Sequence, residues 1–359
     1  MVQAAVAPIG VAVVGLDHWY NAFPFIAQVT AHPRFRLVAI AHGDAQRAAS
    51  AVAQAGSGFA TTDPLRAISD GAVDVVASFT TVDRNAHWCR AAAQHGKHVL
   101  AGKPLAMTIA DAKSAAEAAE TAGTLVFPFE SYGRVTNLYR TIKRWIDEGR
   151  VGEVLSIDCR HDAALPISWH DDPTPGWWTD AAHNPGGGWI DHAIYQIDVI
   201  RHLTGREVER IEGRVATVHH DWLPFEDDGS AEIHLSGGTR CTSRAHWLVP
   251  QGTFRRQVDV IGSEGMILYD NVGDTVRLRS TAETGDDAGP PDATLPPAAA
   301  ELQRPSGWRV FQTAAPDAPG LLDHVANVLE GREPPAATAH DGVANLDAAL
   351  RFYAAARTG

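Results

Sequence analysis

The first third of the chain alternates short β-branched runs with alanine-rich amphipathic segments, and this alternation constrains the fold more than any other feature. The apolar runs are Ile9–Val14, Phe35–Ala41, Val73–Ser78, His98–Leu100 and Leu125–Phe129. Helical patterns lie between them at Ala45–Ala55, Asn85–His95 and Ile109–Thr121. Strands and helices that alternate at this spacing predict an α/β fold with a doubly wound parallel sheet. We therefore expect a Rossmann domain over residues 1–130.

Residues 131–359 have a different pattern, which predicts a second, α+β domain. Tyr132–Gly149 is expected to form one long helix that ends at a glycine. Six half-polar runs follow it: Glu153–Arg160, Val208–Val218, Ser230–Leu235, Thr239–Trp247, Arg256–Ile261 and Met266–Tyr269. Alternation of polar and apolar residues in such runs predicts a large, mainly antiparallel sheet with one open, polar face.

One of these runs shows the alternation clearly. Its polar side consists of Arg240, Thr242, Arg244 and His246, and its apolar side includes Cys241, Ala245 and Trp247. Residues 280–305 contain proline pairs and are expected to form a loop. Two helices, Gly320–Leu329 and Asp341–Ala356, close the chain, and the C-terminal helix is expected to pack back on the first domain.

Composition excludes several classes of protein. The 359 residues carry a formal charge of −13, which would repel nucleic-acid backbones and anionic membranes. Three widely spaced cysteines favour a reducing compartment and no thiolate metal site. The apolar start lacks a basic leader, and no apolar stretch approaches the ~18 residues that a membrane-spanning helix needs. We expect a cytoplasmic protein without nucleic-acid or membrane partners.

The first strand runs into Gly15, where a Rossmann fold binds the phosphates of a dinucleotide. Of the three small residues that the dinucleotide fingerprint requires, only Gly15 is present, because Asp17 and Tyr20 occupy the other two positions. From this loop alone, it remains open that the segment is a strand–turn–helix that binds no nucleotide. At the end of the second strand His42 replaces the acid that binds the adenosine ribose, so NAD and NADP both remain possible cofactors.

Two later motifs, in their order and context, resemble the Gfo/Idh/MocA oxidoreductase family (glucose-fructose oxidoreductase and inositol dehydrogenase). The first is Gly96-Lys97-His98-Val99-Leu100 followed by Gly102-Lys103-Pro104, which keeps the family's Lys-Pro pair but has Gly for its Glu. The second is the glycine triplet 186–188 that leads to Asp191, with Tyr195 where the family has His. Matches at 149–154 and 331–355 extend the resemblance over nearly the whole chain.

The resemblance implies catalytic roles for three residues. Lys103 would hydrogen-bond the reacting oxygen, Asp191 would fix the substrate, and Tyr195 would act as the acid or base. Asp191 and Tyr195 are four residues apart and therefore share a helical face, whereas His192, the rival acid or base, is turned about 100° away. A packing role for Tyr195 remains open. The expected cofactor site contains Gly15, Asp17, His18, Trp19, His42, Thr80, His87, Lys103 and Pro104.

A stretch before the glycine triplet is rich in tryptophan and histidine, a combination suited to a sugar or polyol. The expected substrate-binding residues are Glu130, Arg134, His161, Trp177, Trp178 and His192. Each tryptophan could instead serve only in packing. Adjacent pairs such as His219-His220 and His161-Asp162 point to opposite faces of a strand, so no metal site is expected.

These observations predict an NAD- or NADP-dependent dehydrogenase or reductase that acts on a secondary alcohol or ketone of a sugar, cyclitol or glycoside. Two alternatives remain: NAD-assisted cleavage of a glycoside, as in some family members, and a non-catalytic relative that binds a ligand. The resemblance also implies a homodimer or homotetramer formed through the open sheet face. Substrate, stereochemistry, oxidised position and reaction direction stay undetermined.

Overall fold

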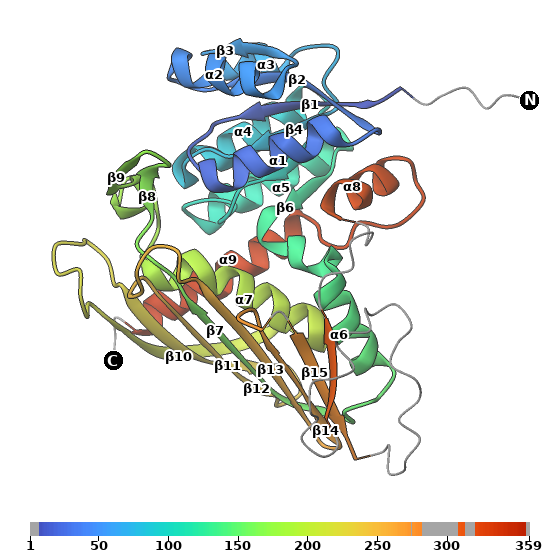
Figure 1. Cartoon of the computed structure of the whole chain (residues 1–359), viewed down its shortest axis with the longest axis vertical. Helices are drawn as coiled ribbons and strands as arrows, with labels where there is room; N and C mark the ends of the chain where they lie inside the picture. The colour runs from blue at the N-terminus through green and yellow to red at the C-terminus, as the bar shows by residue number, and fades with distance from the viewer. Residues whose placement is uncertain (1–6, 274, 282–307, 313–319, 357–359) are drawn as a thin grey trace, which may run out of the picture. The chain divides into compact units, whose positions relative to one another are not determined.

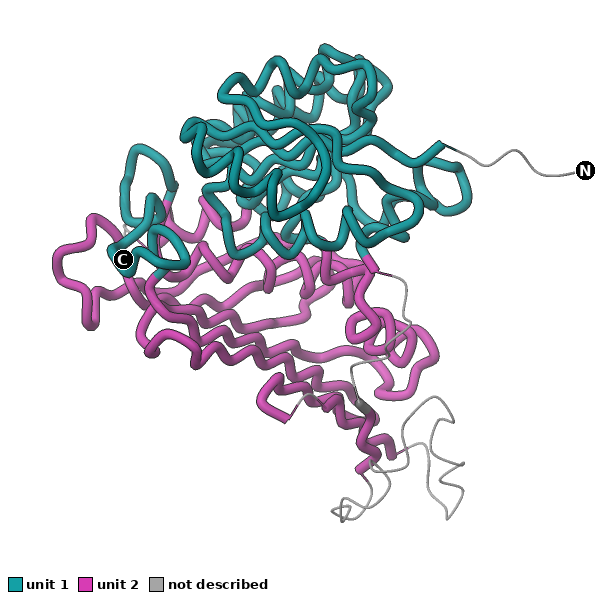
Figure 2. Tube along the Cα trace, turned by 45° about the horizontal axis from the view of Figure 1, so that its top comes forward, with its two compact units in different colours: residues 1–131, 166–185, 321–346 teal, residues 132–165, 186–320, 347–359 magenta. Residues whose placement is uncertain are grey.

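A computed structural model describes residues 7–273, 275–281, 308–312 and 320–356. The chain forms two compact units, which Figure 2 colours separately. Unit 1 comprises residues 1–131, 166–185 and 321–346, and unit 2 comprises residues 132–165, 186–320 and 347–359. The first boundary lies next to the expected one at residue 130, but two later segments also join unit 1.

Unit 1 contains a parallel six-stranded sheet in the order β3-β2-β1-β4-β5-β6 (Figure 1). The strands are β1 (Ile9–Val14), β2 (Phe35–Ala41), β3 (Phe59–Thr61), β4 (Val75–Ser78), β5 (His98–Ala101) and β6 (Val126–Pro128). The helices between them are α1 (Trp19–Ala31), α2 (Ala45–Ala55), α3 (Pro64–Ile68), α4 (Val82–Gln94) and α5 (Ile109–Ala122). This is the Rossmann strand order, in which the direction of winding reverses between β1 and β4.

The two later segments of unit 1 add a hairpin and helices. The hairpin consists of β8 (Ile167–Trp169) and β9 (Asp172–Pro175), followed by the short 3₁₀ helix η2 (Trp177–Thr179). Helix α8 (Leu321–Leu329) places Leu322 and Val325 in the same apolar core as Val11 and Phe25. Helix α9 (Ala339–Ala356) begins in unit 1, and its residues from Asp347 onward belong to unit 2.

Unit 2 contains an eight-stranded sheet in the order β10-β11-β12-β7-β13-β14-β15-β16. Its strands are β7 (Val154–Asp162), β10 (Val208–Ala216), β11 (Asp228–Leu235), β12 (Arg240–His246), β13 (Arg255–Gly262), β14 (Gly265–Asp270), β15 (Thr275–Ser280) and β16 (Arg309–Gln312). All neighbours pair antiparallel except β12 and β7, so the expectation of a mainly antiparallel sheet is confirmed.

Helices α6 (Asn137–Asp147) and α7 (Gly188–Thr204) supply much of the core of unit 2. The isoleucines at 190, 194, 197 and 200 are all fully buried, as their helical spacing requires. The opposite face of the sheet carries exposed polar residues, for example Arg240, Thr242 and Arg244 on β12. This side-chain alternation gives the sheet one apolar and one polar face.

One local expectation is wrong. Tyr132–Gly149 is not one helix, because the 3₁₀ helix η1 (Phe129–Val135) precedes α6 and Thr136 between them has an extended backbone. Gly133 packs so closely on the Tyr139 ring that a Cβ would lie 3.0 Å from it. His246 follows the expected alternation, since it is in register with Asp162 and pairs with it at 2.8 Å, but it is only 3 % exposed. Apart from residues 280 and 281, the expected loop at 280–305 lies outside the described residues.

Candidate functional site

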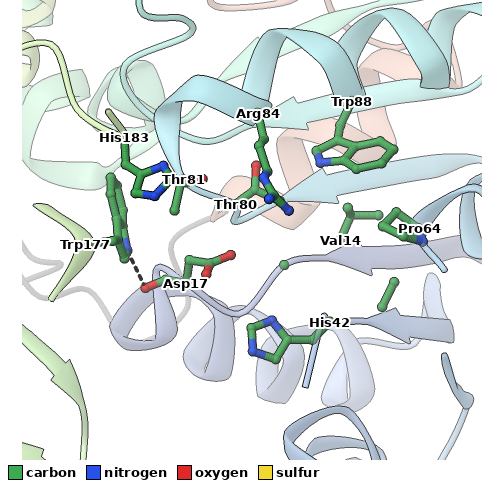
Figure 3. A pocket seen from close by; sticks show the side chains of 13 residues that line it. Val14, Asp17, His42, Pro64, Thr80, Thr81, Arg84, Trp88, Trp177 and His183 are labelled. Atoms are coloured by element: carbon green, nitrogen blue, oxygen red, sulfur yellow. Dashed lines mark hydrogen bonds between the residues drawn. The ribbon is translucent and has the colours of Figure 1, made fainter. Parts of the chain in front are cut away.

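A cavity of about 300 Å³ opens at the carboxyl edge of the parallel sheet in unit 1 (Figure 3). Its residues come from the ends of β1, β2 and β4, from α3 and α4, and from the segment after β9. They are Val14, Gly15, Asp17, Ala41, His42, Gly43, Pro64, Thr80, Thr81, Arg84, Trp88, Trp177 and His183. The cavity therefore lies at the switch point between β1 and β4, where open α/β sheets bind their ligands.

Gly15 forms the turn from β1 to α1 and leaves the cavity open. Its φ is +82°, a conformation that favours glycine, and a Cβ there would lie 2.6–2.8 Å from three atoms of Thr80. The loop after Gly15 can thus approach a ligand closely, as the phosphates of a dinucleotide require. This geometry fits a dinucleotide although two of the three fingerprint glycines are missing.

Asp17 and His42 point into the cavity from the β1–α1 loop and the end of β2, and Arg84 approaches from α4 (Figure 3). Burial raises the pKa of Asp17, against the smaller opposing effects of His42 and Arg84. Burial also lowers the pKa of His42, against the opposing effect of Asp17. Both shifts favour the neutral forms of the two groups.

Beside His42, and outside the residues that line the cavity, a cation lies on an aromatic ring. The guanidinium carbon of Arg47 lies 4.1 Å from the centre of the Trp169 ring, and the His42 ring is nearly parallel to the same tryptophan. Asp44 accepts hydrogen bonds from the backbone N–H groups of Gln46 and Arg47, which lower its pKa and commit its carboxylate to the start of α2.

Two tryptophans attach residues 166–185 to the β1–α1 loop and to the start of α1. The indole of Trp177 donates to the carbonyl of Asp17 at 3.0 Å, and that of Trp178 donates to the hydroxyl of Tyr20 at 2.9 Å. The two indoles stack with centroids 4.1 Å apart, and the buried His18 ring lies against both of them. Farther along, His183 lies 3.0 Å from Asp83 on α4. The segment is thus held on both walls of the cavity.

Lys103 lies just after β5, with only 2 % of its surface exposed. Its ammonium nitrogen is 4.1 Å from the centre of the Trp178 ring, and its peptide bond to Pro104 is cis. The side-chain amide of Asn85 donates to the carbonyls of Gly102 at 2.6 Å, Pro104 at 3.2 Å and Leu105 at 3.3 Å. A ring face and a buried amide therefore hold this lysine and the backbone around it.

Asp191 lies in the first turn of α7 in unit 2, and the indole of Trp247 donates to its Oδ2 at 2.9 Å. His192 Nε2 lies 3.2 Å from the same oxygen. The His192 ring in turn packs against His161 and Phe254, with centroids 5.5 and 5.7 Å away. The structure thus brings together Asp191, His192 and His161, which the sequence placed in two separate motifs.

Tyr195 is half-buried on α7, and its ring meets that of Tyr132 edge-on at 6.0 Å. Three residues farther along α7, the fully buried Asp198 receives two hydrogen bonds from Arg134, at 2.7 and 3.0 Å. The expected substrate ligand Arg134 therefore fixes α7 to η1. Glu130, another expected ligand, is buried near the end of the first segment of unit 1.

The amino end of α7 is held by a buried carboxylate. Glu226 accepts hydrogen bonds from the backbone N–H groups of Gly187 at 3.1 Å and Trp189 at 3.2 Å and from the hydroxyl of Tyr353 at 2.5 Å. Burial raises the pKa of Glu226, and these donors oppose that effect. Glu226 thus satisfies two backbone N–H groups at the start of α7 that have no partner within the helix.

The expected cofactor residues do not all line the cavity. Gly15, Asp17, His42 and Thr80 do, but His18, Trp19, His87, Lys103 and Pro104 are absent from its lining. His18 is buried beneath the two tryptophans, Trp19 packs against Trp169, and His87 is exposed beside Trp88. Sequence reasoning missed Arg84, Trp88 and the cavity position of His183. The start of α4 directly after β4 was the available signal for Arg84.

Among the described residues, one group has the spacing of metal ligands: Glu212, Glu232 and His234 in β10 and β11. His234 also receives a hydrogen bond from Arg210, whose charge opposes cation binding there. Of the helices that the structure describes, none combines the length and apolar character needed to cross a membrane.

Two family models match the sequence. One is described as "Oxidoreductase family, NAD-binding Rossmann fold" and covers residues 9–129. The other is described as "GFO/IDH/MocA C-terminal domain" and covers residues 139–268. The two matches follow each other in the chain, as the two sequence patterns do.

Curated relatives include enzymes that act on sugars and inositols. The chain is 27% identical over 327 residues to 1,5-anhydro-D-fructose reductase of Ensifer adhaerens, covering 90% of this chain and 89% of the relative. It is 24% identical over 270 residues to scyllo-inositol 2-dehydrogenase (NAD(+)) of Bacillus subtilis (strain 168), covering 74% of this chain and 73% of the relative.

Solved structures show the same fold. Aldose-aldose oxidoreductase from Caulobacter crescentus, complexed with glycerol, has a TM-score of 0.78 at 23% identity, with 98% of each chain covered. Levoglucosan dehydrogenase in complex with NADH and L-sorbose has a TM-score of 0.79 at 19% identity, again with 98% of each chain covered.

Proposed function

Because the chain belongs to the Gfo/Idh/MocA oxidoreductase family, we propose that it transfers a hydride between a nicotinamide dinucleotide and a secondary alcohol or ketone of a sugar, cyclitol or glycoside. The relatives named for anhydrofructose, inositol and levoglucosan chemistry support this class of substrate. A nicotinamide, when bound, supplies or accepts the hydride.

The observation that carries this proposal is the buried, immobilised ammonium of Lys103. It lies at the carboxyl end of β5, on the same edge of the sheet as the cavity that fits a dinucleotide. A lysine at this place can donate a hydrogen bond to the oxygen of the reacting carbon and stabilise negative charge that develops there. Asn85 and Trp178 limit its motion, so little reorganisation is needed during the reaction.

We assign proton transfer and substrate binding to residues of unit 2. Tyr195 gives or takes the proton of the reacting oxygen. Asp191 holds a substrate hydroxyl, and His192 and His161 form hydrogen bonds to the same molecule. The contacts of Asp191 with Trp247 and His192 support a fixed acceptor at this position.

At the adenosine end of the cavity, the proposal extends to NADP(H) alongside NAD(H). His42 stands where an acid would repel a 2′-phosphate, and Arg47 is held nearby on Trp169. Asp44 is committed to capping α2.

His42→Asp should weaken NADP⁺ binding at least tenfold and spare NAD⁺ binding, which titration calorimetry measures. Equal affinities for NADP⁺ before and after the change would contradict this extension.

Lys103→Ala tests the proposal, with Lys97→Ala as its matched control. Lys97 is also in unit 1, but its ammonium donates to the carbonyls of Asp70 and Val73 outside the cavity. Lys103→Ala should lower kcat by about 10²- to 10⁴-fold, while the Kd of the dinucleotide and the rate of the Lys97 variant stay within about twofold. The assays use 1,5-anhydro-D-fructose with NADH or NADPH, and scyllo- and myo-inositol with NAD⁺ or NADP⁺. A Lys103→Ala enzyme that works at the wild-type rate would refute the assignment.

A further inference from the structure

The carboxylate of Asp191 is fixed by a tryptophan 56 positions away in the sequence. The indole Nε1 of Trp247 donates to Oδ2 at 2.9 Å, and Nε2 of His192 lies 3.2 Å from that oxygen. Trp247 is fully buried and Asp191 is 3 % exposed. A hydrogen bond to a charged acceptor in such a dry environment is stronger than one in water, so it restricts the rotation of the carboxylate.

Trp247 is itself fixed along its backbone. Its N–H donates to the carbonyl of Asp227 at 2.8 Å, and its carbonyl lies 3.0 Å from Nε2 of His220. On the helix side, Gly188 lies so close that a Cβ would be 3.1 Å from the backbone nitrogen of Trp247. The backbone that carries the indole is therefore held in place, and the fully buried indole has little room to turn away from Asp191.

A second tryptophan shows that packing alone does not account for this contact. Trp189 is also fully buried in unit 2, where it stacks on Phe352 with centroids 3.9 Å apart. Its indole nitrogen has no hydrogen-bond partner among the described residues. Both tryptophans are thus fully buried in unit 2, but of the two only Trp247 donates to the proposed substrate-binding carboxylate.

We infer that Trp247 is a positioning residue for hydride transfer: it orients Asp191 so that this carboxylate can hold the substrate hydroxyl next to the reacting carbon. The inference rests on the proposed function. It assigns a role to a residue outside the motifs of the family resemblance. Since Trp247 acts through Asp191, its effect must disappear when the carboxylate is absent.

The test compares Trp247→Phe with Trp189→Phe, since both changes keep an aromatic ring and remove an indole N–H. The substrates are those of the Lys103 experiment. Trp247→Phe should lower kcat/KM by about 10- to 100-fold, the range of a lost hydrogen bond to a charged group. Trp189→Phe should change kcat/KM by less than about threefold. The Kd of the dinucleotide should stay unchanged in both variants, because its cavity lies in unit 1.

A double-mutant cycle separates positioning from a structural effect. In an Asp191→Ala background, adding Trp247→Phe should change kcat/KM by less than about twofold. A full additional loss in that background, or equal losses in the two tryptophan variants, would overturn the inference. These results leave the proposed function intact, because the Lys103→Ala experiment tests that function separately.

Indole nuclear magnetic resonance provides a measurement that needs no turnover. In protein with ¹⁵N-labelled tryptophan, the signal lost in Trp247→Phe belongs to Trp247. Asp191→Asn should shift that signal strongly and leave the Trp189 signal in place. A Trp247 signal that does not respond to Asp191→Asn would show that the contact is absent in solution and would overturn the inference.

Discussion

The two units hold their candidate groups by different means. In unit 1, Lys103 is held by the face of Trp178 and by an amide that binds the backbone around it. In unit 2, Asp191 is held by a hydrogen-bond donor, and the helix that carries it is held by the Arg134–Asp198 ion pair. Ring faces and amides are insensitive to pH, whereas ion pairs and histidines are not.

This difference indicates which perturbations should act on which unit. Changes in charge at residues packed on α7 should act on the stability of unit 2, where the Arg134–Asp198 ion pair is buried. Changes in backbone geometry should act mainly on unit 1, where the end of a strand and a glycine turn shape the cavity. Four predictions test this contrast.

The largest effect is expected from Asp198→Asn in unit 2. It leaves the guanidinium of Arg134 buried opposite a neutral partner, which should lower the free energy of unfolding by about 3–5 kcal/mol. Asp147→Asn removes the exposed partner of Lys143 and should cost at most about 0.5 kcal/mol. Urea denaturation measures both values. Equal losses in the two variants would contradict the distinction between buried and exposed pairs.

The second effect is a dependence of stability on pH. Burial, with a further contribution from Arg134, lowers the pKa of His202 from 6.5 to about 4. As the pH falls from about 6.5 to about 4, the unfolded chain binds a proton that the folded chain does not, so stability falls by on the order of 3 kcal/mol. Denaturation of His202→Gln across this window should show a smaller slope. An unchanged slope would exclude His202 as its source.

The third effect concerns the amide in unit 1. Asn85→Ala leaves the carbonyls of Gly102, Pro104 and Leu105 without this donor and should cost about 2 kcal/mol in unfolding free energy. It should also lower kcat, since the backbone that carries Lys103 becomes free to move. Gln94→Ala, at the exposed end of the same helix, provides the control. If kcat were unchanged in Asn85→Ala, the amide would not position Lys103.

The smallest effect is expected from Gly15→Ala. The added Cβ is strained at a φ of +82° and meets Thr80, so dinucleotide affinity should fall about tenfold. Gly71→Ala, where a Cβ meets no atom within 4 Å, should leave the affinity unchanged. Calorimetry of both variants compares the two glycines. Wild-type affinity in Gly15→Ala would indicate that the ligand does not approach this turn.

Much of unit 1 could be predicted from sequence because its signals are local. Phe35–Ala41 and Ala45–Ala55 have the same bounds in the structure as in the prediction. Apolar periodicity and the Asp44 cap are sufficient to define such elements. By contrast, the helix expected at Tyr132–Gly149 is interrupted, because Thr136 has an extended backbone between η1 and α6, which apolar periodicity does not indicate.

The contacts around the candidate site could not be predicted in the same way. The Trp247–Asp191 hydrogen bond and the Arg134–Asp198 ion pair join residues 56 and 64 positions apart. No periodicity or spacing rule connects such residues, since their approach depends on how α7 packs against the sheet. Trp177, which the sequence pattern predicts in the substrate site, lies in the wall of the cavity in unit 1.

Titration calorimetry of the purified protein with NAD⁺, NADH, NADP⁺ and NADPH tests whether the cavity in unit 1 binds a dinucleotide, once any nucleotide carried through purification has been removed and identified. We expect saturable binding of both the NAD and the NADP pair. Failure of all four nucleotides to bind, with none carried through purification, would contradict the dinucleotide site and with it the proposed hydride transfer.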